Sequence, residues 1–147
     1  MFLAEQIVAG ARSESEVWAS ALVDQPAWEP VFSPLAPEHL ALGLETVYEA
    51  YLVHYGRPRL FAAPDQDEAV LLGDYLYAHG LVRIAKAGGV PAVAAMAELI
   101  SSCAALRADG AAGDGEAWVE VARALGGAPS GELVERALAW HCGRVEP

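Results

Sequence analysis

Three acidic side chains form the densest group in this sequence that could bind a metal ion. They are Asp65, Asp67 and Glu68, and the first and last are three residues apart, so both face the same side of a helix. Mg²⁺ prefers several hard oxygen ligands, and clustered carboxylates could share such an ion. Acids are also typical of the first turn of a helix, where its dipole favours negative charge. We expect these three acids to mark the start of a helix and not to bind a metal ion.

Basic side chains offer a second kind of chemistry. Arg57 and Arg59 flank Pro58 in a short loop, and two guanidinium groups on a stiffened loop could hold a phosphate or a carboxylate. The alternative is ion pairing with nearby acids, including Asp65 and Asp67, which is the more common arrangement of surface arginines. His79 lies four residues before Arg83 and one helical turn beyond Asp74, but a lone helical histidine more often makes a structural hydrogen bond.

One acid falls within an apolar stripe of the helix expected at 70–87. At helical spacing the stripe consists of Val70, Asp74, Tyr77, Leu81 and Ile84. A carboxylate on a buried face is costly unless it is paired or hydrogen-bonded. We therefore expect Asp74 to accept hydrogen bonds from Arg57 or Arg59, and we expect the substitution Asp74→Leu to lower the stability of the protein.

The elements that position these side chains are predicted to be helices. Alanine, leucine and glutamate are frequent, β-branched runs are few, and no hairpin signal occurs. The sequence therefore predicts one all-α domain over residues 1–147, a bundle of six or seven helices with a proline-rich connector at 25–37, where Trp28 and Phe32 would anchor the chain on the core. The expected helices cover about 2–8, 16–22, 37–54, 65–88, 91–107, 116–125 and 130–141.

Composition narrows the choice of partners and compartment. The chain has 147 residues, is 54% hydrophobic and carries a net charge of −11. Such an acidic surface argues against binding to nucleic acid or to an anionic membrane. Cys103 and Cys142 are expected to be reduced thiols. The N-terminal segment lacks the basic region of a signal peptide, and no uninterrupted apolar run reaches about 18 residues. We expect a cytoplasmic protein without a membrane span.

The segment 45–107 resembles the central part of trans-type polyprenyl diphosphate synthases. Residues 69–76, with the sequence AVLLGDYL, match the A-V-L-x-G-D-x-L pattern of that family. Residues 51–60, YLVHYGRPRL, stand where the family has an aspartate-rich DDxxD motif followed by an arginine-containing loop. His54 stands where the family often has a histidine, but Tyr55 and Gly56 replace both acids that follow it.

The resemblance implies part of the isoprenoid synthase fold without its catalytic machinery. The family's second aspartate-rich motif lies in a C-terminal half with no counterpart here, so we expect no catalytic residue, no metal ligand and no cofactor in this chain. Mg²⁺ would enter only through a catalytic partner. The residues that the resemblance makes candidates for ligand binding are His54, Arg57, Arg59 and Asp74.

The family includes two-component synthases, in which a short degenerate subunit pairs with a full-length one and influences product chain length. The chain resembles such a small subunit of a prenyltransferase, and we expect a heterodimer with a synthase, or a homodimer, with a possible isoprenoid ligand. One alternative is a stand-alone enzyme or binding protein for a diphosphate or isoprenoid, using Asp65, Glu68, Arg57 and His79. Another is a helical interaction module unrelated to isoprenoids.

Overall fold

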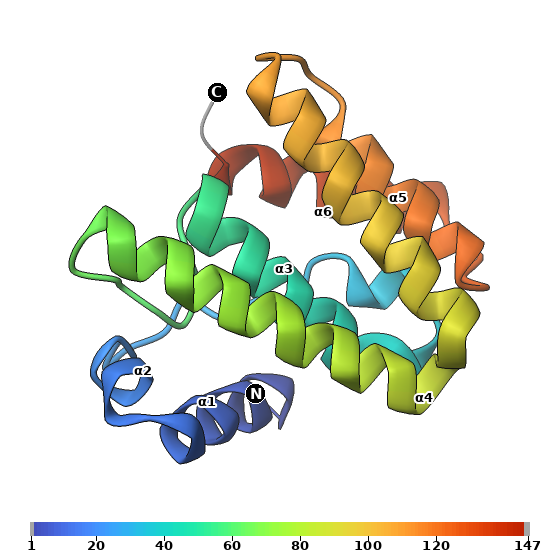
Figure 1. Cartoon of the computed structure of the whole chain (residues 1–147). Helices are drawn as coiled ribbons and strands as arrows, with labels where there is room; N and C mark the ends of the chain where they lie inside the picture. Colours follow the sequence, from blue (N-terminus) through green and yellow to red (C-terminus); the bar gives the residue numbers. More distant parts are fainter. Residues whose placement is uncertain (1, 146–147) are drawn as a thin grey trace.

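The protein has an all-α fold, as the sequence predicts. A computed structural model describes residues 2–145, and this part of the chain contains six α-helices, two short 3-10 helices and no β-strand (Figure 1). The α-helices are α1 (Phe2–Glu14), α2 (Glu16–Ser20), α3 (Ala41–Tyr55), α4 (Gln66–Ala108), α5 (Asp114–Ala124) and α6 (Gly131–Arg144). The 3-10 helices are η1 (Ser33–Leu35) and η2 (Glu38–Leu40). The first helix is longer than the expected segment 2–8, because α1 continues through Gly10 to Glu14.

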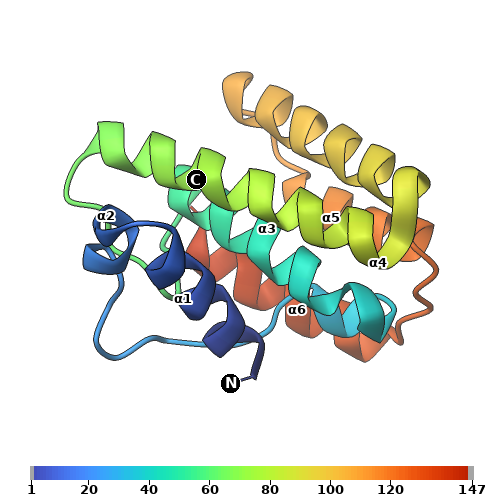
Figure 2. The ribbon, with the colours of Figure 1, turned by 60° about the horizontal axis from the view of Figure 1, so that its bottom comes forward.

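Helix α3 is the central element, and it is buried from Gly43 to Leu52. Helix α1 and the first half of α4 lie along it, while α5 and α6 lie beyond its other side (Figure 2). Two glycines allow close contact between α3 and α4. A Cβ atom at Gly80 would lie 2.5 Å from the Cγ2 atom of Val47, and one at Gly43 would lie 2.6 Å from the Cδ1 atom of Ile84. The helix pair therefore depends on residues without side chains.

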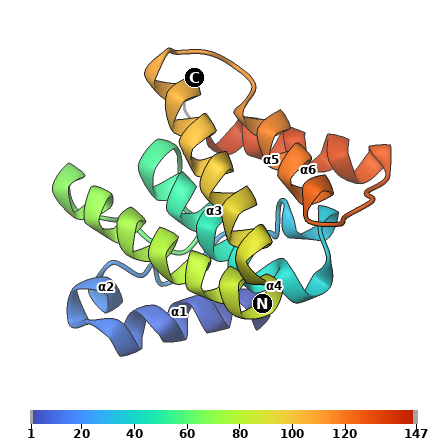
Figure 3. The same cartoon turned by 45° about the vertical axis from the view of Figure 1, so that its right-hand side comes forward.

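Helix α4 bends sharply near its middle. Gly89 has a φ of 74°, in the left-handed region that glycine tolerates best, and Pro91 begins the second half, where its missing N–H is not needed (Figure 3). The sequence predicts two helices separated at Gly88 and Gly89. The structure joins them through this kink, so that the second half leaves α3 and packs against α5.

A buried ion-pair network joins the loop after α3 to α3 itself. The Arg59 guanidinium lies 2.5 Å from Glu45 Oε1 through Nη1 and 2.9 Å from Glu49 Oε1 through Nε. All three side chains are 0% exposed. The two glutamates are four residues apart, so they occupy successive turns of the same face. One cation thus lies between two anions in the interior.

The remaining carboxylate oxygens of this network hold backbone from two irregular segments. Glu45 Oε2 accepts hydrogen bonds from the amides of Val31 and Ser33, at 3.1 and 3.0 Å. Glu49 Oε2 accepts one from the amide of Leu60 at 2.7 Å. The connector at 25–37 and the loop after α3 are therefore attached to the core by side-chain acceptors instead of by a regular backbone pattern.

Both aromatic anchors expected in the connector contact the core. Phe32 is 1% exposed and stacks on Trp118, with ring centroids 5.4 Å apart. Trp28 lies over the Arg59 guanidinium, with 4.3 Å between the Cζ atom and the ring centroid. Aromatic rings in such positions bury apolar area and also stabilise the adjacent cation.

Asp74 is not on the buried face of α4, so the expectation for this residue is wrong. Its side chain is 64% exposed and lies 3.7 Å from His54 Nε2, and it makes no contact with Arg57 or Arg59. The buried ridge of α4 consists of Leu72, Leu76, Gly80 and Ile84. The apolar pattern predicts the wrong buried face because Gly80, which has no side chain, packs directly against Val47 of α3. Asp74→Leu is accordingly not expected to lower stability.

Replacing Arg59 with methionine is expected to lower the free energy of unfolding by about 3–5 kcal/mol, because two buried carboxylates would lose their cation. Chemical unfolding monitored by circular dichroism measures this change. The control is Arg123→Met, since Arg123 pairs with Glu120 on the surface and such pairs contribute about 0–1 kcal/mol. Equal effects of the two substitutions would contradict the role given to Arg59.

Candidate functional site

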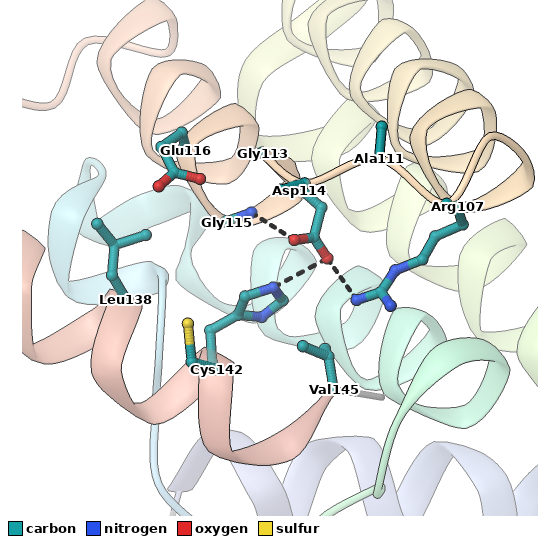
Figure 4. Close-up of a pocket in the computed structure, with 12 residues that line it drawn as sticks. Arg107, Ala111, Gly113, Asp114, Gly115, Glu116, Leu138, Cys142 and Val145 are labelled. Atoms are coloured by element: carbon teal, nitrogen blue, oxygen red, sulfur yellow. Dashed lines mark hydrogen bonds and ion pairs between the residues drawn. The ribbon is translucent and has the colours of Figure 1, made fainter. Parts of the chain in front are cut away.

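A pocket lies where the end of α4, the start of α5 and the end of α6 meet (Figure 4). Its volume is about 730 Å³. The loop from Gly110 to Gly113 forms one wall, and Leu138 and Cys142 of α6 form the opposite one. Three ionisable residues, Arg107, Asp114 and His141, form its polar floor. We therefore take this pocket as the candidate site.

Asp114, the first residue of α5, is the centre of the polar floor. Its Oδ2 atom accepts hydrogen bonds from Tyr51 Oη at 2.6 Å, Arg107 Nη2 at 2.7 Å and His141 Nε2 at 3.0 Å. Its Oδ1 atom accepts one from the amide of Gly115 at 2.9 Å. The four donors come from four different helices, so this carboxylate connects α3, α4, α5 and α6.

The two contacts of His141 fit one tautomer of a neutral imidazole. The ring is 1% exposed, and its Nδ1 atom lies 2.6 Å from the hydroxyl oxygen of Tyr48, whose side chain is fully buried. A neutral imidazole has one donor and one acceptor nitrogen. Donation by Nε2–H to Asp114 leaves Nδ1 to accept the proton of the Tyr48 hydroxyl. This arrangement satisfies all three side chains at once.

The network alters the proton affinities of its members. Burial raises the pKa of Asp114, but hydrogen bonds from His141, Tyr51 and Arg107 outweigh burial and hold that pKa well below its usual range. Burial and the hydrogen bond to Asp114 raise the pKa of Tyr51 far above its usual range. Burial also raises the pKa of the nearby Cys103 thiol to about 11. At pH 7 the floor therefore presents an ionised aspartate, and the Tyr51 phenol and Cys103 thiol behind it are neutral.

Chemically, this arrangement is better suited to holding helices and shaping a polar surface than to nucleophilic attack. Tyr48 and His141 are almost fully buried, and every oxygen of Asp114 already accepts a hydrogen bond. The ionisable groups on the open side of the pocket are the Arg107 and Asp114 ion pair, each side chain 16–17% exposed, and the exposed Glu116 and Cys142. The pocket could thus bind a small polar ligand next to the Arg107 and Asp114 ion pair.

The residues predicted from the sequence lie elsewhere, and they do not form one group. Arg59 is buried against its glutamates, whereas Arg57 is exposed and donates from Nη2 to the carbonyl oxygen of Gly143. His54 and Asp74 do come together, as described above, and His54 Nε2 also lies 3.1 Å from the carbonyl oxygen of Val70. The four predicted residues thus divide into three separate environments.

The acidic cluster at 65–68 behaves as a helix start. Asp65 Oδ1 accepts a hydrogen bond from the amide of Glu68 at 2.9 Å and caps α4. His79 lies 3.8 Å from a carboxylate oxygen of Glu14 instead of near these acids. Within residues 2–145 there is no group of three or more histidine, cysteine, aspartate or glutamate side chains that could hold a metal ion.

No motif in the sequence indicates that Arg107, Asp114, His141 and Tyr51 form a group. One local signal exists, because Asp114 follows a glycine-rich loop and begins a helix. A second is that His141 lies in a row with the apolar residues Ala137 and Val134 of α6. Neither signal indicates that these residues meet, since Tyr51 and Asp114 are 63 positions apart.

Comparison with known proteins yields no match: no family model, no curated protein and no solved structure is significantly similar to this chain.

The substitution Asp114→Asn is expected to lower the free energy of unfolding by about 1–3 kcal/mol at pH 7, because it weakens charge-assisted hydrogen bonds to buried groups. The folded protein keeps Asp114 ionised at pH values where the unfolded chain protonates it. Its contribution is therefore complete above the ordinary aspartate pKa of about 3.9 and is lost as the pH falls below that value.

Unfolding curves of both proteins between pH 7 and pH 3 test this expectation. The difference in stability should be constant down to about pH 4 and should shrink below it. Asp24→Asn is the matched control, since Asp24 is exposed. A difference that increases toward low pH would contradict the assignment of Asp114 as an ionised acceptor.

Proposed function

We propose that this protein is a non-catalytic, polyprenyl-synthase-like subunit that binds a full-length polyprenyl diphosphate synthase and influences the length of its product. The observation that carries the proposal is an apolar outer face on α4, the helix that also contains the residues resembling that family. The catalytic groups, and any Mg²⁺ that they require, would belong to the partner.

The outer face of α4 consists of Leu71, Ala78, Val82 and Ala85. These residues are spaced by seven, four and three positions, so they form one stripe along the first half of the helix. Leu71 is 59% exposed and Val82 is 51% exposed. Figure 1 views this half of α4 with no other helix in front of it. The exposed Asp74 interrupts this stripe between Leu71 and Ala78, and the apolar part that follows it is typical of an interaction site.

Charge supports the same location for a partner. The chain has 20 acidic and 9 basic residues, yet no aspartate or glutamate occurs between Asp74 and Glu98. Lys86, near the stripe, is exposed. Long-range repulsion would oppose association over much of this acidic surface but least along the outer face of α4. The part of this face from Ala78 to Ala85 has no acids, and it suits another helix that packs lengthwise against it.

A membrane is the main competing occupant of this surface. Helix α4 is long and apolar enough to cross a bilayer by length and composition alone. Its most apolar window has a mean hydropathy of 1.6, and 22% of that window is buried. The net charge of −11 disfavours an anionic lipid surface, and we therefore favour a protein partner.

The end of α3 is consistent with a subunit that does not perform the reaction itself. Tyr55 and Gly56 occupy the positions where the related synthases have their first acids. Gly56 forms an isolated bridge with Val145, and a Cβ atom at position 56 would collide with the carbonyl oxygen of Arg144. This backbone contact leaves no room at position 56 for an aspartate side chain.

Coexpression with the polyprenyl diphosphate synthases of the same genome tests the proposal. We expect one of them to copurify as a heterodimer and to give products of altered chain length. Val82→Glu should weaken this complex about a hundredfold or more, since it would bury an unpaired charge. Size-exclusion chromatography with light scattering, titration calorimetry and product analysis measure these effects.

Val17→Glu is the matched control, because Val17 is also 51% exposed but lies on α2. It should leave the complex intact. Equal weakening by both substitutions would remove the outer face of α4 from the interface. Absence of any complex with a synthase would contradict the proposed function, and binding of the protein to liposomes instead would assign α4 to lipid.

A further inference from the structure

Two arginines from distant parts of the chain meet where the loop after α3 touches the end of α6. The amide of Arg57 donates to the carbonyl oxygen of Arg144 at 2.8 Å, and its Nη2 group donates to the carbonyl oxygen of Gly143. In return, Arg144 donates from Nε to the carbonyl oxygen of Arg57 at 3.2 Å and from Nη2 to that of Pro58 at 3.0 Å. The two cations therefore share one small region.

Neither guanidinium has a carboxylate partner within residues 2–145, and both donate only to backbone carbonyl groups. Four other arginines form ion pairs with carboxylates, namely Arg59, Arg107, Arg123 and Arg136. Arg83 also lacks a carboxylate partner in the described part of the chain, and it donates to the Thr46 hydroxyl and the Gln6 carbonyl oxygen. In a chain with 20 acids and 9 bases, two neighbouring arginines without an acid are unexpected. Burial and the charge of Arg57 lower the pKa of Arg144, and they outweigh the charge of the nearby Glu49, which raises that pKa.

Helix capping explains only part of this arrangement. A cation near the last carbonyl groups of a helix is favourable, and one arginine at the end of α6 would satisfy that need. The second cation adds repulsion, and most N–H groups of both guanidiniums have no acceptor among the described residues. Arg144 is also held in place by Trp140, with 5.1 Å from its Cζ atom to the ring centroid. The donors are thus oriented before any ligand arrives.

We infer that Arg57 and Arg144 bind a free oxyanion with phosphate or carboxylate chemistry at the junction of the loop after α3 and the end of α6. Planar guanidinium groups match the oxygen spacing of both anions, and one anion would relieve the repulsion between the two cations. Arg144 lies outside the segment that resembles the synthases, and the site does not depend on the proposed partner. Absence of anion binding would therefore leave the proposed function unaffected, and absence of a synthase partner would leave the anion site unaffected.

Nuclear magnetic resonance of the arginine Nε–H groups in the full chain tests this inference. The protein is titrated with inorganic phosphate in one series and with citrate in another, each against sodium chloride at the same ionic strength. We expect saturable shifts of the Arg57 and Arg144 signals with at least one of the two anions. The anion that binds more tightly identifies the chemistry of the ligand.

Arg57→Gln should weaken the binding about tenfold or more, because it removes charge-assisted hydrogen bonds. Arg57 is exposed, so this variant should retain the fold, as a thermal melt can verify. Arg123→Gln is the control and should bind as the unmodified protein does. The inference is overturned if neither anion produces saturable shifts beyond those of chloride, or if Arg123→Gln weakens binding as much as Arg57→Gln.

Discussion

The burial of one arginine between two glutamates is the constraint on which this structure depends. Arg59, Glu45 and Glu49 are removed from water, and a charge in such a place is tolerated only when its partners have good geometry. Each carboxylate therefore fixes the backbone that approaches it. The connector before α3 and the loop after it have little regular structure of their own, and they lie where the glutamates need donors.

This network and the polar floor of the pocket are physically continuous through Tyr48. Its ring lies 5.1 Å from the Arg59 guanidinium carbon, and its hydroxyl group contacts His141, which in turn contacts Asp114. Helix α3 thus has one polar face toward the irregular segments and another toward α5 and α6. Helix α4 packs closely against α3 through glycines. The opposite side of the first half of α4 is exposed. That exposed side is the basis of the proposed function.

Local signals predict much of the fold. Helical periodicity, the caps at Asp65 and Ser130, and the prolines of the connector all act over a few residues, and they agree with the starts of α4 and α6 and with the irregular connector. The first helix is longer than expected, and the stripe through Asp74 is misplaced. Predictions that required partners distant in sequence fared less well. Arg59 pairs with acids 10 and 14 positions before it, beyond the turn of the chain, instead of with Asp65 or Asp67. The Asp74 prediction failed because Gly80 forms part of the buried ridge of α4, and a pattern of apolar side chains does not count glycine as a core residue.

Native-state hydrogen exchange of the Val31 and Ser33 amides tests the central constraint most directly. Val31 lies outside any helix and Ser33 begins a single 3-10 turn, so without Glu45 both amides would exchange as loop amides do. We predict that they exchange only through openings as costly as those that expose the amides of α3. Exchange at the rate of a solvated loop, with α3 still protected, would contradict the account.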